Sequence, residues 1–484
     1  MGETLEDLVG WASHLPTDWL ICDDNHQFSQ RTEELYLELK QLSKRGNPPK
    51  IILAEREPVR FLAGFIAACA AHCPVFLCNP DWVKQEWQQV FDLVQPDVIW
   101  GMGHERYEAM PNSQSPMPNS IMIPTGGSSG QIKFAIHTWE TLMASVQGFT
   151  EYFLLNQVNS FCVLPLYHVS GLMQFLRSFT TGGKLAILPF KEVESSKIYN
   201  IQPSEFFISL VPTQLQRLLQ NPQLTEWLSK FETVLLGGAP AWNELLEKAR
   251  YHKIRLAPTY GMTETASQIA TLKPDDFLSG KVNSGKILPH ARVTICNCDG
   301  EILKTNQIGN IRIQSQSLFI GYYVSYLASK DKTEPINSTF PANPENQNLL
   351  KYLQVDDLGF LDQQGYLIIV GRSSDKIITG GENVHAIEIE SAIRATEMVV
   401  DVYVIGVPDK SWGQAVTAIY IPKNSNTSTL EIKSLLKDKL SKFKIPKHWI
   451  PIPTLPRNPQ GKINRQQLQQ IAITILNESK IANG

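Results

Sequence analysis

Residues 233–265 read TVLLGGAPAWNELLEKARYHKIRLAPTYGMTET. The stretch begins with an apolar, strand-like run, TVLLGG, and continues with a helical pattern. A second short apolar run, RLAP, then leads into a polar turn at residues 259–265. Strands that alternate with helical stretches are typical of βαβ units, in which helices cover the faces of a sheet. This stretch therefore predicts an α/β fold.

The same alternation extends toward the N-terminus. Further strand-like runs, separated by helical stretches, lie at residues 51–54, 74–78, 97–100, 161–165, 184–189 and 206–211. The longest apolar stretch, Phe61 to Cys78, contains Pro74, which cannot continue a helix. We interpret it as a buried helix that ends near Ala71, followed by the strand PVFLC, and not as a membrane span.

From about residue 280 the pattern changes to short alternating strands such as ARVTIC, NIRIQS and GYLIIVG. We expect a small β-rich unit on the same body. The last part of the chain predicts a separate α+β domain, with helices at 387–396, 430–440 and 464–476 and strands at 401–407 and 415–421. The expected division is an N-terminal domain of layered α/β sheets at 1–371, a hinge at 372–376 and a mobile C-terminal domain at 377–484.

Composition narrows the class of protein. Among 484 residues, 43% are hydrophobic and 19% are charged, which is enough apolar material for a large core and too little charge for disorder. The net charge of −3 predicts no basic surface for nucleic acid. Seven cysteines without a CxxC pair predict free thiols in a reducing compartment. Because the N-terminus also lacks a basic, signal-like segment, we expect a cytoplasmic protein with no membrane span.

Two polar motifs each have a structural and a functional explanation. Residues Thr125 to Gly130 read TGGSSG, with Lys133 close behind, and could bind phosphate through backbone N–H groups and hydroxyls or form a flexible linker. The spacing of a Walker A loop is absent. Residues 259–265, TYGMTET, could hold Mg²⁺ and a phosphate or simply begin a helix with Thr263 as its cap.

Three later motifs are equally open when each is taken alone. Asp357 and Arg372 could bracket a ribose diol, or be a solvated surface pair. Gly380 and Gly381 are expected to form a turn after KIIT. Lys462 lies on a Gly-flanked loop, PQGKINR, where an exposed lysine is the ordinary explanation.

Taken together, the motifs resemble the acyl-adenylate-forming superfamily of acyl-CoA synthetases, adenylation domains and firefly-type luciferases. TGGSSGQIK resembles its phosphate loop, usually TSGTTGxPK, and YGMTET matches its adenine and magnesium motif. DDLG, GRSSDKIITGGENV and PQGKINR match later motifs, so that the resemblance runs from about residue 50 to 466. It implies two half-reactions. A carboxylate attacks ATP in the presence of Mg²⁺, and a thiol, usually coenzyme A, then attacks the acyl-adenylate.

The resemblance also implies roles for individual residues. Phosphate contacts fall to Thr125, Ser128, Ser129, Gly130, Lys133 and Thr263. The adenine pocket falls to Gly238, Ala239, Pro240, Tyr260 and Gly261. Asp357 and Arg372 would hold the ribose, and Glu264 would hold Mg²⁺. Gly381 would lie beside the pantetheine tunnel, and Asp375 would be the hinge. Lys462 would be the mobile catalytic lysine.

Gly126 and Ile132 depart from the family pattern, which has Ser and Pro at these positions. Both changes soften the loop, although Thr125, Ser128 and Ser129 keep their hydroxyls. Activity is therefore still expected.

The acid is suggested by residues 165–172, PLYHVSGL. The resemblance implies that His168 is a catalytic residue that gates the acyl pocket and contacts the forming adenylate, and that Gly171 also contacts the acid. This motif, GGAPAWNELL and the chain length look most like the o-succinylbenzoate–CoA ligases of menaquinone and phylloquinone biosynthesis. Arg177 lies in the apolar run LMQFLRSF and needs a buried anion. That anion could be the ring carboxylate of an aromatic keto-dicarboxylate. Alternatively, Arg177 could reach the surface or pair with a structural Glu.

Three other functions remain open from the sequence. A fatty-acyl or aryl-acyl-CoA synthetase is the alternative within the class. A carrier-protein-loading adenylation module would usually be joined to a carrier domain, and a silent homologue would have lost Glu264 or Lys462. The expected partners are small molecules, with neither nucleic acid nor membrane, and the sequence is compatible with a homo-oligomer.

Overall fold

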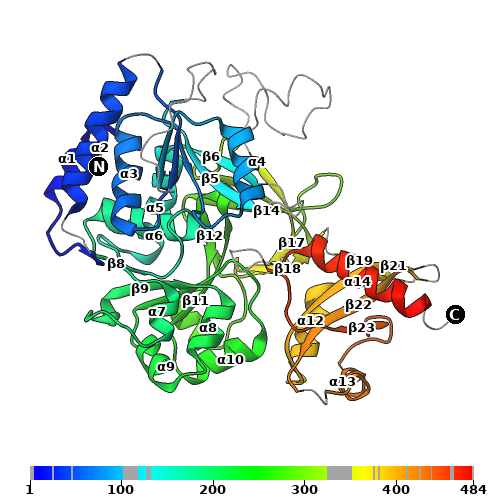
Figure 1. Cartoon of the computed structure of the whole chain (residues 1–484). Coiled ribbons are helices and arrows are strands. Elements are labelled where there is room, and N and C mark those ends of the chain that lie inside the picture. The colour runs from blue at the N-terminus through cyan, green and yellow to red at the C-terminus, as the bar shows by residue number, and fades with distance from the viewer. Residues whose placement is uncertain are drawn as a thin grey trace.

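The computed structural model describes residues 5–23, 27–44, 47–101, 118–126, 132–323, 352–373, 376–379, 382–409, 412–424, 427–437, 439–457 and 463–481. These residues form four sheets with helices packed on them (Figure 1). The predicted α/β class, with a β-rich unit and a smaller α+β part near the C-terminus, is confirmed.

The largest sheet has eight strands in the order β1-β8-β7-β9-β10-β11-β12-β13. Its strands are β1 (Leu20–Ile21), β7 (Asn159–Cys162), β8 (Leu185–Ile187), β9 (Phe206–Leu210), β10 (Thr233–Leu236), β11 (Leu256–Met262), β12 (Ser267–Thr271) and β13 (Lys286–Ile287). Pairing is parallel from β1 to β11 and antiparallel from β11 to β13. Residues 233–265 thus contain β10 and β11, which are joined by the helix α10 (Asn243–Tyr251).

A second sheet has six strands in the order β16-β6-β5-β3-β2-β4. They are β2 (Ile51–Ala54), β3 (Val75–Leu77), β4 (Val98–Gly101), β5 (Ile121–Gly126), β6 (Ile132–His137) and β16 (Gly321–Tyr322). The helices of the same body are α1 (Leu8–His14), α2 (Phe28–Ser43), α3 (Pro58–Ala70), α4 (Lys84–Val94), α5 (Trp139–Phe153), α6 (Val169–Thr181), α7 (Phe190–Glu194), α8 (Pro212–Leu218), α9 (Pro222–Ser229) and α11 (Pro274–Leu278).

One hydrophobic core joins these two sheets. It contains the apolar side chains of α3 and α6 together with residues of β2, β3 and β5 from one sheet and β7 and β8 from the other. Every residue of α3 from Phe61 to Ala70 is buried, which explains why the longest apolar stretch of the sequence carries no polar face. Within the described ranges, no helix is long and apolar enough to cross a membrane.

The β-rich unit is a four-stranded antiparallel sheet, ordered β14 (Ala291–Cys296), β15 (Gly309–Ser315), β17 (Leu353–Leu361) and β18 (Leu367–Arg372). The C-terminal unit has five strands, β19 (Lys376–Thr379), β20 (Glu382–His385), β21 (Val399–Asp409), β22 (Gly413–Pro422) and β23 (His448–Pro451). Its helices are α12 (Ala386–Arg394), α13 (Thr429–Leu436) and α14 (Arg465–Ile481).

Two expectations about local structure are wrong. The chain does not turn directly after RLAP, because β11 continues to Met262 and pairs with β12 through a bulge at Tyr260 and Gly261. Residues 448–451, expected in a loop, form β23, which pairs with β22 in parallel. The polar loops expected at 101–120 and 328–348 lie largely or wholly outside the described residues.

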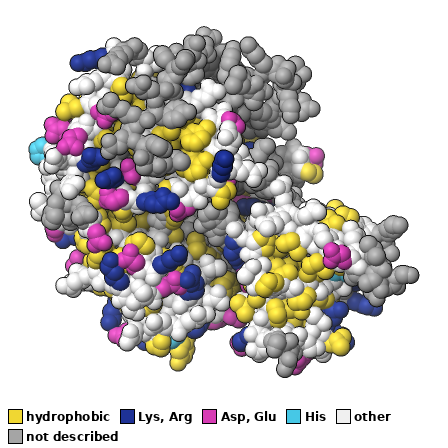
Figure 2. Space-filling model, in the orientation of Figure 1, with side chains coloured by type: hydrophobic (Ala, Val, Ile, Leu, Met, Phe, Trp, Pro, Cys, Tyr) yellow, Lys and Arg dark blue, Asp and Glu magenta, His cyan; other side chains and the backbone are white. Residues whose placement is uncertain are grey.

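The seven cysteines are all described, and all are free thiols, as expected. In Figure 2, positive and negative side chains are interspersed over the large body, and hydrophobic side chains gather on the smaller C-terminal unit. The visible face therefore carries no broad surface of one sign, in keeping with the net charge of −3.

Candidate functional site

Three of the residues assigned to the nucleotide meet where β11 reaches the β-rich unit. The Tyr260 hydroxyl donates a 2.6 Å hydrogen bond to Asp357 Oδ2, and Arg372 Nε donates to Asp357 Oδ1 at 3.2 Å. Asp357 and Arg372 are directly opposite each other on β17 and β18. The Asp357 side chain is only 15% exposed. The Arg372 side chain is 53% exposed, so the cluster buries the carboxyl group of Asp357 and leaves the guanidinium at the surface.

The protonation of this cluster follows from burial. Burial raises the pKa of Tyr260 well above its ordinary value, and the negative charge of Asp357 raises it further. Tyr260 therefore stays a neutral donor to a carboxylate. Asp357 keeps acceptor capacity for a further donor, such as a sugar hydroxyl.

Gly261 is required by close contact between two strands. A Cβ added there would lie 2.1 Å from the backbone oxygen of Ser267 on β12. Gly238, at the carboxyl end of the neighbouring strand β10, has a φ of +81°, a conformation that favours glycine. Because β10 and β11 are parallel, the exposed residues Gly238, Ala239 and Pro240 lie at the same sheet edge as Thr259. This is the edge at which parallel α/β sheets bind ligands.

Glu264 lies in a short 3-10 helix, η4 (Thr263–Thr265), directly after β11. Its Oε1 accepts a 2.6 Å hydrogen bond from the hydroxyl of Tyr322, on β16. Lys133 Nζ lies 5.6 Å from the centre of the same Tyr322 ring. Tyr322 thus joins two predicted site residues, and sequence reasoning missed it because Tyr322 belongs to no recognised motif.

Thr263 is held from the second sheet. Its backbone oxygen lies 2.8 Å from Nε2 of the buried His137, at the end of β6. Burial lowers the pKa of His137 to about 4, so the ring is neutral. A short 3-10 helix does begin at Thr263, but its cap is Met262 and not Thr263, so only the cap assignment of that explanation is wrong.

Thr125 and Lys133 face each other in register on the antiparallel strands β5 and β6. These two strands therefore flank the glycine- and serine-rich motif in the sequence. Six predicted site residues lie outside the described residues: Ser128, Ser129, Gly130, Asp375, Gly381 and Lys462.

His168 caps α6 and Gly171 lies in its first turn, and residues 163–167 connect His168 to the end of β7. The Tyr167 and His168 rings are 4.5 Å apart. A Cβ at Gly171 would lie 2.2 Å from the backbone oxygen of Pro165, so only glycine lets α6 approach the preceding turn this closely. The helix then extends into the core with Arg177 one turn before its end.

Arg177 is a buried cation, with only 2% of the residue exposed. Its guanidinium lies 4.1 Å from the centre of the Phe149 ring, and Nη2 is 3.4 Å from Ser267 Oγ and 3.5 Å from Gln268 Oε1. These two hydrogen bonds are long and therefore weak. Within the described part of the chain, no carboxylate pairs with Arg177, and its Nε has no hydrogen-bond partner. Both structural explanations, surface exposure and a structural Glu, are thus excluded for the described residues.

Burial lowers the pKa of Arg177 to about 9, so the side chain stays charged at neutral pH. A buried charge without a counter-ion is costly. Ser267, which contacts it, adopts an unusual φ of +91°, and its neighbour Ala266 has a φ of +50°. Such strain is typical of functional sites.

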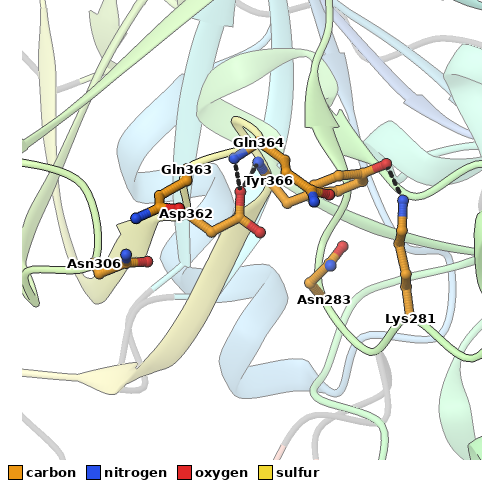
Figure 3. A pocket seen from close by; sticks show the side chains of 7 residues that line it. All are labelled: Lys281, Asn283, Asn306, Asp362, Gln363, Gln364 and Tyr366. Carbon is orange, nitrogen blue, oxygen red and sulfur yellow. Dashed lines mark hydrogen bonds between the residues drawn. The ribbon is translucent and has the colours of Figure 1, made fainter.

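A polar pocket lies elsewhere, on the β17–β18 turn and the segment before β13 (Figure 3). Its lining residues are Lys281, Asn283, Asn306, Asp362, Gln363, Gln364 and Tyr366. Lys281 Nζ donates to Asp276 at 2.7 Å and to the Tyr366 hydroxyl at 2.5 Å, and that hydroxyl donates to Asp276 at 2.9 Å. None of the predicted site residues lines this pocket, so the pocket is not the predicted site.

The donor set around Glu264 fits a magnesium ion. No group of three or more His, Cys, Asp or Glu side chains gathers among the described residues, which excludes a closed protein cage there. Mg²⁺ usually takes one or two carboxylates together with substrate phosphates and water. Glu264 supplies one such carboxylate beside Thr263 and Lys133.

The fold and the site define the class of protein. Residues 102–323 match the sequence family of AMP-binding enzymes, and residues 388–462 match the C-terminal domain of AMP-binding enzymes. The chain belongs to this family of AMP-forming acyl-CoA ligases, as the motifs predicted.

Among curated relatives, the chain is similar to 2-succinylbenzoate–CoA ligases. It is 33% identical to that of Oceanobacillus iheyensis over 355 residues, covering 72% of this chain and 68% of the relative. It is 34% identical to that of Listeria monocytogenes serotype 4b over 354 residues, covering 72% and 69%. With the enzyme of Bacillus subtilis the match extends to 400 residues, at 29% identity, covering 81% and 77%.

Solved structures show the same fold. The o-succinylbenzoate CoA synthetase of Bacillus subtilis, in complex with its acyl-adenylate intermediate, superimposes with a TM-score of 0.78 at 24% identity, covering 97% of this chain and 99% of the other. The amide bond synthetase of Marinactinospora thermotolerans has a TM-score of 0.76 at 19% identity, covering 96% and 99%. Because ligases of different chemistry share this fold, the acid has to be argued from the site.

Proposed function

We propose that the chain is an ATP-dependent acid–thiol ligase that activates o-succinylbenzoate and transfers it to coenzyme A. Family membership supports the reaction class, and the identity of 33–34% to 2-succinylbenzoate–CoA ligases supports the acid. The product belongs to menaquinone or phylloquinone biosynthesis, which takes place in the cytoplasm under this proposal.

In the first half-reaction, the aliphatic carboxylate of the substrate attacks the α-phosphorus of ATP. A P–O bond forms, the bond to pyrophosphate breaks, and an acyl-adenylate results. When bound, Mg²⁺ neutralises charge on the phosphates. Asp357 accepts hydrogen bonds from the ribose and is held for that task by Tyr260 and Arg372. Gly238, Ala239 and Pro240 line the adenine side.

Lys462 stabilises this first step by lying between two groups that repel each other, the carboxylate and the α-phosphate. In the second half-reaction the sulfur of coenzyme A attacks the acyl carbonyl, and AMP leaves. Lys462 has to move away so that the thiol can approach. We propose that the unit at residues 377–484 carries it by turning at Asp375, within a hinge at 372–376, and that Gly381 then borders the pantetheine tunnel.

The observation that supports the choice of acid is Arg177. o-Succinylbenzoate has two carboxylates, of which one reacts, so the other needs a cation inside an otherwise apolar pocket. Arg177 is a buried cation with no carboxylate partner among the described residues, and it lies on the helix that begins at His168. A fatty-acyl or simple aryl acid would leave this charge uncompensated.

The test is pyrophosphate release measured with a panel of acids, each with and without coenzyme A. The panel contains o-succinylbenzoate, its analogue without the ring carboxylate, benzoate and a medium-chain fatty acid. We expect release with o-succinylbenzoate at a kcat/KM at least tenfold above the others, with thioester formed only when coenzyme A is present. Preference for a fatty or simple aryl acid would overturn the proposed acid and leave the reaction class standing.

A further inference from the structure

A second polar side chain lies near Arg177. His290 occupies the turn between β13 and β14, and its backbone is fixed there. Its carbonyl oxygen accepts a 3.0 Å hydrogen bond from Ser315 Oγ, and the N–H of Ala291 donates to Leu288 at 3.0 Å. The side chain therefore projects from a well-anchored position.

The imidazole of His290 packs directly on the backbone of α5 at Gly148. A Cβ at Gly148 would lie 1.8 Å from Nδ1 and 2.4 Å from Cγ of His290. The next residue of the same helix, Phe149, stacks on the Arg177 guanidinium at 4.1 Å. One short stretch of α5 thus holds both His290 and Arg177.

Several polar atoms of this cluster are buried and lack partners. Among described residues, neither ring nitrogen of His290 has a hydrogen-bond partner, and the same is true of Arg177 Nε, Gln174 Oε1 and Ser178 Oγ. Buried polar groups in folded proteins are nearly always hydrogen-bonded. Several such groups on α6 and at one neighbouring turn therefore indicate a bound group that supplies the partners.

The charge state of His290 suits a shared anion. Burial and the positive charge of Arg177 together lower the pKa of His290 to about 4. The ring is therefore neutral and offers one N–H donor. A cation and a neutral donor can bind the two oxygens of one carboxylate without repelling each other.

We propose that His290 is a specificity-determining residue that donates a hydrogen bond to the carboxylate held by Arg177. The inference rests on the proposed function, because that carboxylate is the non-reacting, ring-borne one of o-succinylbenzoate. Gly148 belongs to the same binding site, because only a residue without a side chain leaves room for the imidazole of His290.

The experiment compares His290→Ala, His290→Asn and His290→Gln with the full-length enzyme. KM and kcat are measured for o-succinylbenzoate and for the analogue without the ring carboxylate. For His290→Ala we expect KM for o-succinylbenzoate to rise about tenfold, as for loss of one hydrogen bond to a charged group, with little change in kcat. KM for the analogue should stay at the wild-type value. Asn and Gln place an N–H near the position of one or the other ring nitrogen, so one of them should recover most of the affinity.

Two controls separate recognition from packing. His14→Ala removes an exposed histidine and should change neither constant. Gly148→Ala should raise KM for o-succinylbenzoate by displacing the ring, and it should add little further loss once His290 is already alanine.

The outcomes distinguish this inference from the proposed function. Suppose that the wild-type enzyme uses o-succinylbenzoate. If His290→Ala then keeps a wild-type KM for it, or if KM rises equally for both acids, the inference fails and the proposed function stands. If the wild-type enzyme does not use o-succinylbenzoate at all, both fail together.

Discussion

Arg177 shows at the scale of one residue how function and stability oppose each other. The sequence identified it as an arginine in an apolar run, and the structure places it in the core, stacked on Phe149. A buried charge that only a substrate can compensate destabilises the empty enzyme. This is the pattern expected of a residue kept for binding.

Arg177→Met should therefore weaken substrate binding without weakening the fold. Methionine keeps an unbranched apolar stem but removes the charge. KM for o-succinylbenzoate should rise roughly 10–150-fold, while KM for ATP stays near wild type, because a charge-assisted hydrogen bond contributes about 1.5–3 kcal/mol. The melting temperature should stay equal or rise. A loss of stability together with an unchanged KM would show that Arg177 is structural.

Tyr322 is a site residue that belongs to none of the recognised motifs. It reaches Glu264 because β16 pairs with β6, with Tyr322 opposite Ala135. The sequence around Tyr322 does not predict this contact. Only the pairing of two strands that are far apart in the sequence brings it to the predicted magnesium ligand.

At the scale of elements, the antiparallel pair β11–β12 determines the site. The bulge at Tyr260 and Gly261 lets β11 carry Tyr260 to Asp357 on one side and lets β12 present Ser267 and Gln268 to Arg177 on the other. One strand pair therefore connects the nucleotide residues with the acid-binding arginine.

Gly261→Ala should disrupt this pair. The added Cβ would lie 2.1 Å from a backbone oxygen that cannot rotate away, so the two strands must separate. We expect a loss of at least about 1–3 kcal/mol in the free energy of unfolding, measured in urea, together with a higher KM for ATP. Gly10→Ala is the matched control, because nothing lies within 4 Å of its Cβ, and a helix favours alanine over glycine. Equal stability of the two variants would refute this account of the bulge.

At the scale of the whole molecule, the two parts of the chain touch. Arg394, at the end of α12, lies 5.6 Å from the ring centre of Trp242, which follows β10 in the large body. Arg394 also pairs with Asp401 at 3.3 Å, and Asp401 binds Arg457, five residues before Lys462 in the sequence. A chain of contacts thus runs from Trp242 in the large body to Arg457.

Lys462→Ala should separate the two half-reactions. Removing one charge-stabilising group should slow adenylate formation by about 10²-fold or more. Thioester formation from preformed adenylate should change little, since the lysine is then away from the site. Rapid-quench measurement of each step tests this, and an equal loss in both would contradict the two-state assignment.

Asp375→Pro should do the opposite. Proline fixes φ near −65° at the position proposed as the hinge. Adenylation should persist while thioester formation collapses, because the small unit can no longer cross between its two orientations. The two rates are compared with the wild-type enzyme, and wild-type values for both would place the hinge elsewhere.

Much of the fold follows from local pattern. The predicted runs at 51–54, 206–211 and 233–238 contain the strands β2, β9 and β10, because apolar runs bounded by turns are buried in a parallel sheet. The segment 448–451 was missed, because β23 becomes a strand only by pairing with β22. Local preferences cannot reveal a strand whose hydrogen bonds all go to a distant segment.

The sequence by itself determined the chemical class. Ordered motifs supply the turns and side chains that bind ATP. Each motif is short, so it can be recognised in the sequence without knowing which segments lie together in the fold. Only the tertiary structure decided that Arg177 has no carboxylate partner among the described residues. It also decided that His290 packs on Gly148, next to the residue that stacks on Arg177. Whether a charge is compensated depends on neighbours from other elements, here α5, α6, β12 and the β13–β14 turn. Those neighbours are brought together by burial and strand pairing, over distances along the chain that no motif spans.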